Sequence, residues 1–155
     1  MNEQLKALAK RVPPQWVKYK GKFKYVEHAI ITQSILATLG PTSQKVDQII
    51  YNGDTVTGVL LTMTFNIDGV TVEVTEAGDC EHPKEGKNGL NLQMAISSAY
   101  KRCCMRVGKG LQCWTDNDDF YILDKVLEDK EKLQFDHAEI TNTITQIIVD
   151  SFDEY

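Results

Sequence analysis

The sequence has no long apolar run, no secretion-type start and no cysteine pattern typical of a disulfide framework. Apolar runs such as Val59-Leu60-Leu61 and Ile147-Ile148-Val149 are far shorter than the roughly 20 residues that cross a bilayer. Met1-Asn2-Glu3-Gln4 does not join a basic start to an apolar stretch, so we expect no secretory signal. These absences favour a cytoplasmic protein without a membrane partner.

The four cysteines, at positions 80, 103, 104 and 113, include no C-x-x-C pair. This spacing is typical of reduced thiols in a reducing compartment. A zinc site made by Cys80 and His82 with another cysteine is a weaker alternative, because C-x-H is not a usual zinc spacing. We therefore expect no metal site.

Signatures of catalysis are also scarce. The phosphate-binding pattern G-x-x-x-x-G-K-[ST] is absent, so we expect no ATP and no other cofactor. A nuclease would need clustered carboxylates, for which Glu73, Glu76 and Asp79 are candidates. Glu73 alternates outward on a predicted strand, however, and a polar strand face explains it more simply. No local pattern supports Cys-His catalysis, so we predict a binding protein and no enzyme.

The charge is unevenly distributed. Of the 155 residues, 116–155 hold 12 acidic and three basic side chains, a net charge of −9, whereas the total is −5. Residues 1–115 therefore hold 14 basic and 10 acidic side chains, a net charge of +4. A basic body joined to an acidic segment is compatible with a nucleic-acid partner, although the acidic total alone would argue against one.

Periodicity and turn residues predict an α+β fold. An antiparallel β-meander (a β-β-β-α core) packs on a long basic helix, with further helices at the N-terminal and C-terminal ends. Segment 16–25 fits either an extended segment or a tight hairpin around Gly21. Asn88 or Asn91 is the expected cap of the long helix. The predicted helices cover residues 3–10, 26–39, 90–107, 119–133 and 137–149, the predicted strands cover 45–51, 55–66 and 70–76, and a loop is predicted at 77–89.

The long helix carries a candidate row of cations. Its apolar residues Leu92, Ile96, Ala99, Cys103 and Val107 form one stripe at helical spacing. Arg102, Arg106 and Lys109 follow one edge of that stripe, and Lys101 lies on the opposite side. Such a row can meet evenly spaced phosphates, but solvated charges near a helix C-terminus give the same pattern. The absence of acidic residues from 86 to 115 favours the anion site.

A second basic segment mixes lysines with aromatic residues. Lysines can hold phosphates while aromatic rings stack on bases, as in proteins that bind single strands with little sequence preference. Alternatively, the aromatic residues pack into the core and the lysines protect an edge strand from aggregation. The candidate DNA-binding residues of this segment are Lys18, Tyr19, Lys20, Lys22, Phe23, Lys24 and Tyr25.

The helix segment Ala99–Gly110 resembles that of Rad52-like single-strand annealing proteins, which include DdrA-like and phage recombinases. The shared features are a Lys-Arg pair (Lys101-Arg102), a base four residues later (Arg106), then Gly-x-Gly and an aromatic, for which Trp114 is the counterpart. The stretches Val12–Lys18, Tyr25–His28 and Leu39-Gly40 also resemble the start of these domains. Val107 stands where the family has a bulky aromatic, and Cys103 and Cys104 stand where it has small residues.

The resemblance implies a homo-oligomeric ring or filament that holds single-stranded DNA in a basic groove. Lys101, Arg102 and Arg106 would face the DNA backbone, and the protein would anneal complementary strands without ATP in recombination and repair. It also implies a phage protein in a bacterial host, or a bacterial one. Residues 1–115 would form the DNA-binding core, with 116–155 as an acidic helical segment.

The acidic segment leaves other functions open. It could recruit a host replication or recombination protein, mask the basic groove, or simply be a solvated tail. The alternative functions are therefore an acidic-tailed protein-interaction module and, less favoured, a metal-dependent nuclease.

Overall fold

The computed structural model describes residues 3–115 and 144–151. The chain divides into two units, one spanning Asn2–Cys113 and the other holding Trp114–Tyr155 with Met1. In the second unit, residues 144–151 are helical, as expected for part of the predicted helix at 137–149. The predicted helix at 119–133 lies outside the described residues.

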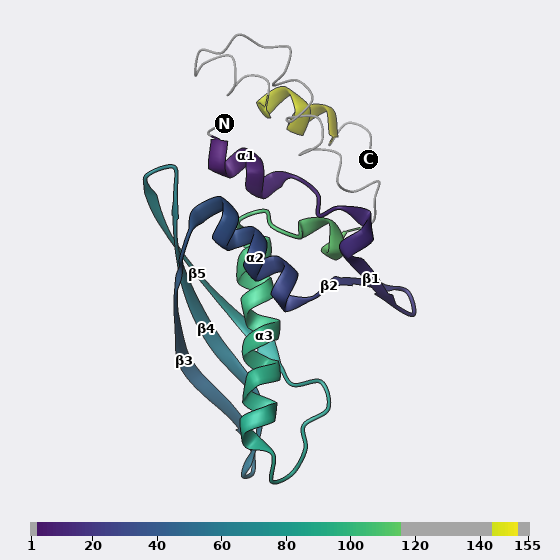
Figure 1. Ribbon diagram of the computed structural model, residues 1–155, viewed down its shortest axis with the longest axis vertical. Helices are drawn as coiled ribbons and strands as arrows, with labels where there is room; N and C mark the ends of the chain where they lie inside the picture. Colours follow the sequence, from purple (N-terminus) through teal and green to yellow (C-terminus); the bar gives the residue numbers. More distant parts are fainter. Residues whose placement is uncertain (1–2, 116–143, 152–155) are drawn as a thin grey trace. The chain divides into compact units, whose positions relative to one another are not determined.

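The first unit is built on a three-stranded antiparallel sheet (Figure 1). Strands β3 (Ser43–Asn52), β4 (Thr55–Ile67) and β5 (Val70–Asp79) follow one another in that order, which confirms the predicted meander. The turns use residues with positive φ, Gly53 in the first and Asp68-Gly69 in the second. These angles give the tight reversals expected for hairpins between twisted strands.

Strand β4 forms the centre of the core because alternate side chains point from it toward one face. Val59, Leu61, Met63 and Phe65 are completely buried. Helix α3 (Asn88–Arg106) packs on this face, where it contacts β4 and β5, as Figure 1 shows. The core therefore lies between the sheet and one side of α3, and the α+β class is confirmed.

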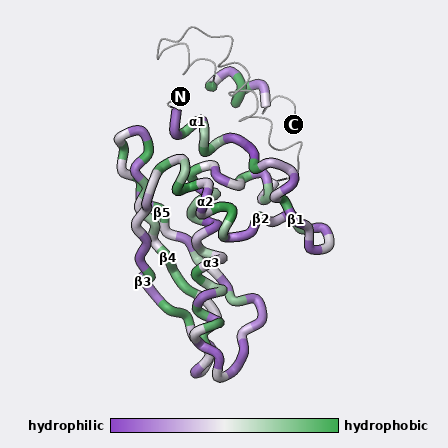
Figure 2. Tube along the Cα trace, viewed as in Figure 1, coloured by the Kyte–Doolittle hydropathy of each residue, from purple (hydrophilic) through white to green (hydrophobic). Residues whose placement is uncertain are grey.

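Strand β5 extends further than the sequence indicated. It continues to Asp79, so the prediction of a loop from residue 77 was wrong. A Cβ on Gly78 would lie 2.2 Å from the Ala95 carbonyl oxygen and 2.7 Å from the Ala99 Cβ. Gly78 therefore belongs to a close approach of strand and helix that only glycine permits. The remaining loop, between β5 and α3, is hydrophilic along most of its length (Figure 2).

The start of α3 is fixed by two asparagines, but neither caps the helix as predicted. Helix α3 begins at Asn88, and no side chain caps it. The Asn88 amide instead donates to the Asp54 carbonyl, and its oxygen accepts from the Val56 N–H. The fully buried Asn91 accepts from the Lys84 N–H and donates to the Lys84 carbonyl, both at 2.9 Å. Both side chains therefore tie the helix start to neighbouring segments.

The N-terminal part of the unit supplies two helices and a small hairpin. Helix α2 (His28–Leu39) contacts α3 and helix α1 (Glu3–Ala9). The Asp68 carboxylate accepts hydrogen bonds from the Gln4 and Leu5 N–H groups at the start of α1. A 3-10 turn, η1 (Pro14–Trp16), leads into β1 (Val17–Lys20) and β2 (Phe23–Val26), so segment 16–25 is the hairpin rather than the extended segment.

After α3, the 3-10 turn η2 spans Leu111–Trp114. Among the helices of residues 3–115 and 144–151, none is both long and apolar enough to cross a membrane.

Candidate nucleic-acid interface

The β1–β2 hairpin pairs a lysine with an aromatic residue at three successive positions. Its register places Lys18 opposite Tyr25, Tyr19 opposite Lys24, and Lys20 opposite Phe23. Side chains opposite each other in an antiparallel pair lie on the same face, about 5 Å apart at Cβ. Each position therefore presents one cation beside one ring.

The turn at Gly21 (φ 62°) divides the aromatic residues between the two faces of the hairpin. One face carries Val17, Tyr19, Lys24 and Val26, and the other carries the remaining two lysine–aromatic pairs. Val26 is buried, so the first face joins the hairpin to the core at its base. The alternation in the sequence therefore produces two mixed faces, not an aromatic face and a lysine face.

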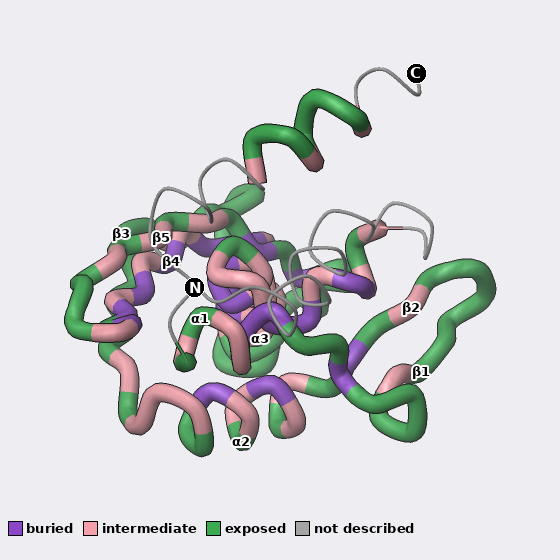
Figure 3. The backbone as a smooth tube through the Cα atoms, turned by 90° about the horizontal axis from the view of Figure 1, so that it is seen from above, coloured by how far each residue is buried: buried purple, intermediate pink, exposed green. Residues whose placement is uncertain are grey.

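The aromatic rings of the hairpin are largely exposed. Phe23 is 78% exposed, Tyr19 68% and Tyr25 37%. Figure 3 shows the hairpin exposed along nearly its whole length. The alternative in which these residues pack into the core is therefore wrong for Phe23 and Tyr19. These exposed rings are available for stacking.

Two hairpin lysines form ion pairs at the surface. Lys18 donates to Glu27, and this hydrogen bond, with the charge of Glu27, raises the pKa of Lys18. Lys20 lies 3.4 Å from a Glu81 carboxylate oxygen. All four side chains are at least half exposed, and pairs of this kind contribute little to stability. Lys22 lies in the exposed turn.

Lys24 of the hairpin and Lys101 of α3 both influence the thiol of Cys113. Burial raises the pKa of the Cys113 thiol, while the positive charges of Lys24 and Lys101 lower it. Both lysines therefore lie within electrostatic range of the same sulfur. Lys101 also lowers the pKa of His28, after the larger effect of burial, and the His28 ring lies 4.5 Å from that of Tyr100. His28 is the first residue of α2 and follows β2 closely, so Lys101 lies within electrostatic range of the chain just after the hairpin.

Lys101 is itself partly withdrawn from water. Burial lowers its pKa, although the nearby Cys113 opposes that shift. A cation that has already lost part of its hydration interacts more strongly with a phosphate than a fully solvated one does. Among the predicted cations of this unit, Lys24 and Lys101 are therefore linked by their shared electrostatic effect on Cys113, and Lys24 lies opposite Tyr19 in the hairpin.

The predicted row of Arg102, Arg106 and Lys109 does not form as expected. Arg106 donates through Nε to Glu76 of β5, so the acidic partner comes from the sheet and not from residues 86–115. Helix α3 ends at Arg106, and positive φ angles at Gly108 and Gly110 turn the chain inward. Lys109 is consequently only 6% exposed, and its Nζ donates to the Ala7 carbonyl at 3.3 Å. Arg102 is half-buried on the helix.

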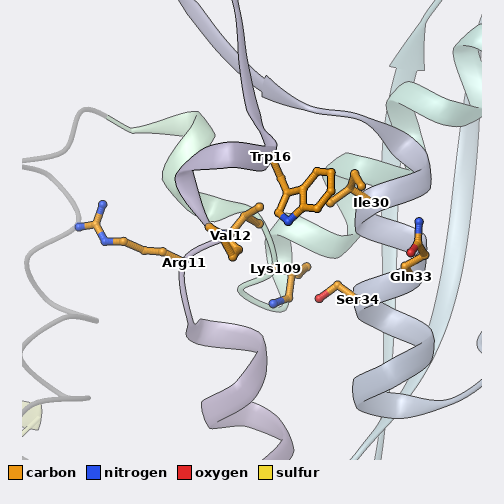
Figure 4. Close-up of a pocket in the computed structure, with 8 residues that line it drawn as sticks. Arg11, Val12, Trp16, Ile30, Gln33, Ser34 and Lys109 are labelled. Atoms are coloured by element: carbon orange, nitrogen blue, oxygen red, sulfur yellow. The ribbon is translucent and has the colours of Figure 1, made fainter.

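A cavity of about 520 Å³ lies beside Lys109 and was not predicted. Its other lining residues include Arg11 and Trp16 from the segment around η1, and Ile30, Gln33 and Ser34 from α2 (Figure 4). These residues are far apart in sequence, so no local motif signals the site. The sequence feature that came closest to predicting this cavity was Trp16, which lies in the stretch Val12–Lys18 that resembles the start of Rad52-like domains.

The cysteines are free thiols, and Cys103 and Cys104 are completely buried. Burial is the main cause that raises the pKa of Cys103 to about 11 and that of Cys104 to about 12. In residues 3–115 and 144–151, no three His, Cys, Asp or Glu side chains gather as a metal-binding group. The Cys103 and Cys104 thiols are therefore neutral core side chains at physiological pH.

Comparison with known proteins gives no family. The chain matches no protein-family model and no curated protein sequence. The similarity to Rad52-like annealing proteins therefore rests on the residues quoted above and stays a prediction.

Proposed function

We propose that this protein binds single-stranded DNA and anneals complementary strands without ATP, as a homo-oligomer acting in recombination and repair. The observation that carries the proposal is the hairpin, where three of the four paired positions set a lysine beside an aromatic ring. Its rings are exposed, and Lys24 and Lys101 of α3 both lie within electrostatic range of Cys113. Cations bind phosphates at any sequence, and rings stack on any base.

Such a surface is suited to annealing because it reads no base edges. The strand would be held by its backbone and by a few stacked bases, which leaves the other bases free to pair. Neutralised phosphates also repel an incoming complementary strand less. Base pairing then provides the specificity, and the downhill reaction needs no nucleotide hydrolysis.

Assembly into a homo-oligomer is supported by strand β3. It forms one edge of the sheet, and nine of its ten residues are exposed. Val46, Ile50 and Tyr51 are among the exposed apolar side chains. An open edge of this kind can pair with another chain. Sedimentation of the full chain should show a multimer, and a strictly monomeric species would contradict this part of the proposal.

The remaining parts of the proposal concern the cellular setting. We place the protein in the bacterial cytoplasm, as a phage or bacterial product. The acidic segment 116–155 is our candidate site for a host replication or recombination protein. Binding by the isolated partner to full-length protein, but not to a chain ending at residue 115, would support that assignment.

The test of DNA binding is fluorescence anisotropy with a labelled single-stranded oligonucleotide, repeated across salt concentrations. The double variant Lys24→Gln/Lys101→Gln should bind more weakly. The slope of log affinity against log salt should become shallower by about 1.4, since each phosphate contact on a single strand contributes roughly 0.7. Lys84→Gln/Lys87→Gln, which removes two exposed lysines from the loop before α3, is the charge-matched control and should behave like the wild type.

Annealing is tested with two complementary labelled strands and no ATP. Acceleration by the wild type, reduced in the double variant, supports the proposal. A protein that ignores single-stranded DNA at low salt contradicts it and favours the interaction module. Cleavage of DNA in Mg²⁺ would instead support the nuclease.

A further inference from the structure

The cavity beside Lys109 has the composition of an anion site. Neither Asp nor Glu lines it, whereas Arg11 and Lys109 both do. Its volume of about 520 Å³ lies within the range of pockets that take small ligands, roughly 300 to 1,000 Å³. The buried cation Lys109, in a lining without carboxylates, therefore favours a small ligand with a negative group.

Lys109 is the main polar group of this cavity. It is 6% exposed, and within residues 3–115 it forms no ion pair; its hydrogen bond is to the Ala7 carbonyl. An ammonium has three donors, and one long bond to a neutral oxygen leaves a buried charge poorly compensated. Burial lowers the pKa of Lys109, and the charge of Lys10 adds to that shift. An anion in the cavity would relieve this cost.

The rest of the lining suits a flat ring with polar edges. Trp16 is 46% exposed, and in Figure 4 its indole lies beside Ile30 near Ser34 and Lys109, whereas Arg11 extends away from this group. An indole face provides a stacking platform for any base. Gln33 and Ser34 add an amide and a hydroxyl that can both donate and accept hydrogen bonds at the edge of a base.

We propose that this cavity binds one unstacked nucleotide of the bound strand, with its base on Trp16 and its phosphate on Lys109. The inference rests on the proposed DNA-binding function and adds a nucleotide pocket to it. Trp16 directly precedes Val17 of the hairpin, so the pocket and the lysine–aromatic surface are continuous along the chain. One anchored nucleotide per protomer would fix the strand at intervals and leave the intervening bases free to pair.

The pocket is tested through the fluorescence of Trp16. The chain has two tryptophans, so Trp114→Phe leaves Trp16 as the sole reporter. Thymidine monophosphate should quench this fluorescence to saturation, whereas inorganic phosphate at the same concentration should not. Lys109→Met should weaken the nucleotide affinity about tenfold or more, as expected for the loss of a charged hydrogen-bond partner.

A milder variant keeps the test decisive if Lys109→Met does not fold. Gln33 is exposed, so Gln33→Ala should fold normally and weaken nucleotide binding several-fold. Gln93→Ala, an exposed glutamine on α3 that does not line the cavity, is the matched control and should have no effect.

Oligonucleotide binding separates this inference from the proposed function. An oligonucleotide with normal bases should quench Trp16, and one made of abasic units should bind without quenching. If oligonucleotides bind by anisotropy while Trp16 is unaffected and Lys109→Met and Gln33→Ala bind normally, the pocket is overturned and the proposed function stands. If thymidine monophosphate quenches but no oligonucleotide binds, the pocket stands as a nucleotide site and the proposed function fails. Equal competition by inorganic phosphate would overturn the nucleotide assignment.

Discussion

The three-stranded sheet and the β1–β2 hairpin have similarly alternating sequences, but they differ in how far their alternate side chains are buried. In the three-stranded sheet, alternation puts Phe65 of β4 at 0% exposure against α3. In the β1–β2 hairpin, alternation leaves Phe23 at 78% exposure. The difference comes from the covering element, because a helix lies over the sheet, whereas nothing in residues 3–115 covers the face of the hairpin that carries Phe23. Alternation therefore defines faces, and tertiary packing decides which faces are buried.

The largest expected effect is on stability, from the same substitution at the two phenylalanines. Phe65→Ala leaves a cavity between β4 and α3 and should lower the free energy of unfolding by about 3–5 kcal/mol. Phe23→Ala removes an exposed ring and should change it by less than about 0.5 kcal/mol. Urea denaturation followed by circular dichroism measures both. Equal destabilisation by the two substitutions would mean that the Phe23 ring is packed, and it would contradict the difference in burial between the sheet and the hairpin.

The second effect concerns the contact between β5 and α3. Gly78→Ala places a Cβ where it meets the Ala95 carbonyl oxygen, and should destabilise by about 1–3 kcal/mol or more. Gly89→Ala is the control, since that site on α3 is open and has no positive φ. It should be neutral or stabilising by up to about 1 kcal/mol. A stable Gly78→Ala protein would show that the helix and strand can separate at little cost.

The third effect is a pH dependence of the free energy of unfolding, which arises from the buried Cys104 thiol on α3. The pKa of Cys104 is about 12 in the folded protein, above the ordinary value of 9.0. The unfolded chain therefore loses this proton first, and the stabilising contribution, complete below pH 9, falls as pH rises toward 12. Between pH 9 and 10.5 the free energy of unfolding should fall less steeply in Cys104→Ala, by up to about 1.4 kcal/mol per pH unit. Parallel profiles for wild type and variant would contradict a buried neutral thiol.

The smallest effect is at the Arg106–Glu76 pair, where α3 meets the edge strand β5. The Arg106 side chain is 60% exposed, so a double-mutant cycle with Arg106→Ala and Glu76→Ala should give a coupling of less than about 1 kcal/mol. A coupling above 2 kcal/mol would show that this pair, unlike the hairpin ion pairs, helps to hold the sheet on the helix.

The sequence was sufficient to predict the meander and the long helix, because their periodicity and turn residues are local. It did not predict that β5 runs through Gly78, since a glycine needed for close packing looks like a loop residue. The acidic partner of Arg106 was also missed, because Glu76 lies 30 positions away. The sequence also did not predict that Lys109 lines a cavity with Trp16. That position depends on the direction of the chain after α3, which no local pattern specifies.

The most direct test of the central claim is the affinity of Phe23→Ala for single-stranded DNA at fixed salt, compared with Val70→Ala. Val70 is an exposed apolar residue (61%) at the start of β5, away from the hairpin pairing. Loss of one stacked base should weaken binding by Phe23→Ala about tenfold, with an unchanged salt slope, whereas Val70→Ala should bind like the wild type. Wild-type affinity in Phe23→Ala would contradict the assignment of the hairpin as the DNA-binding surface.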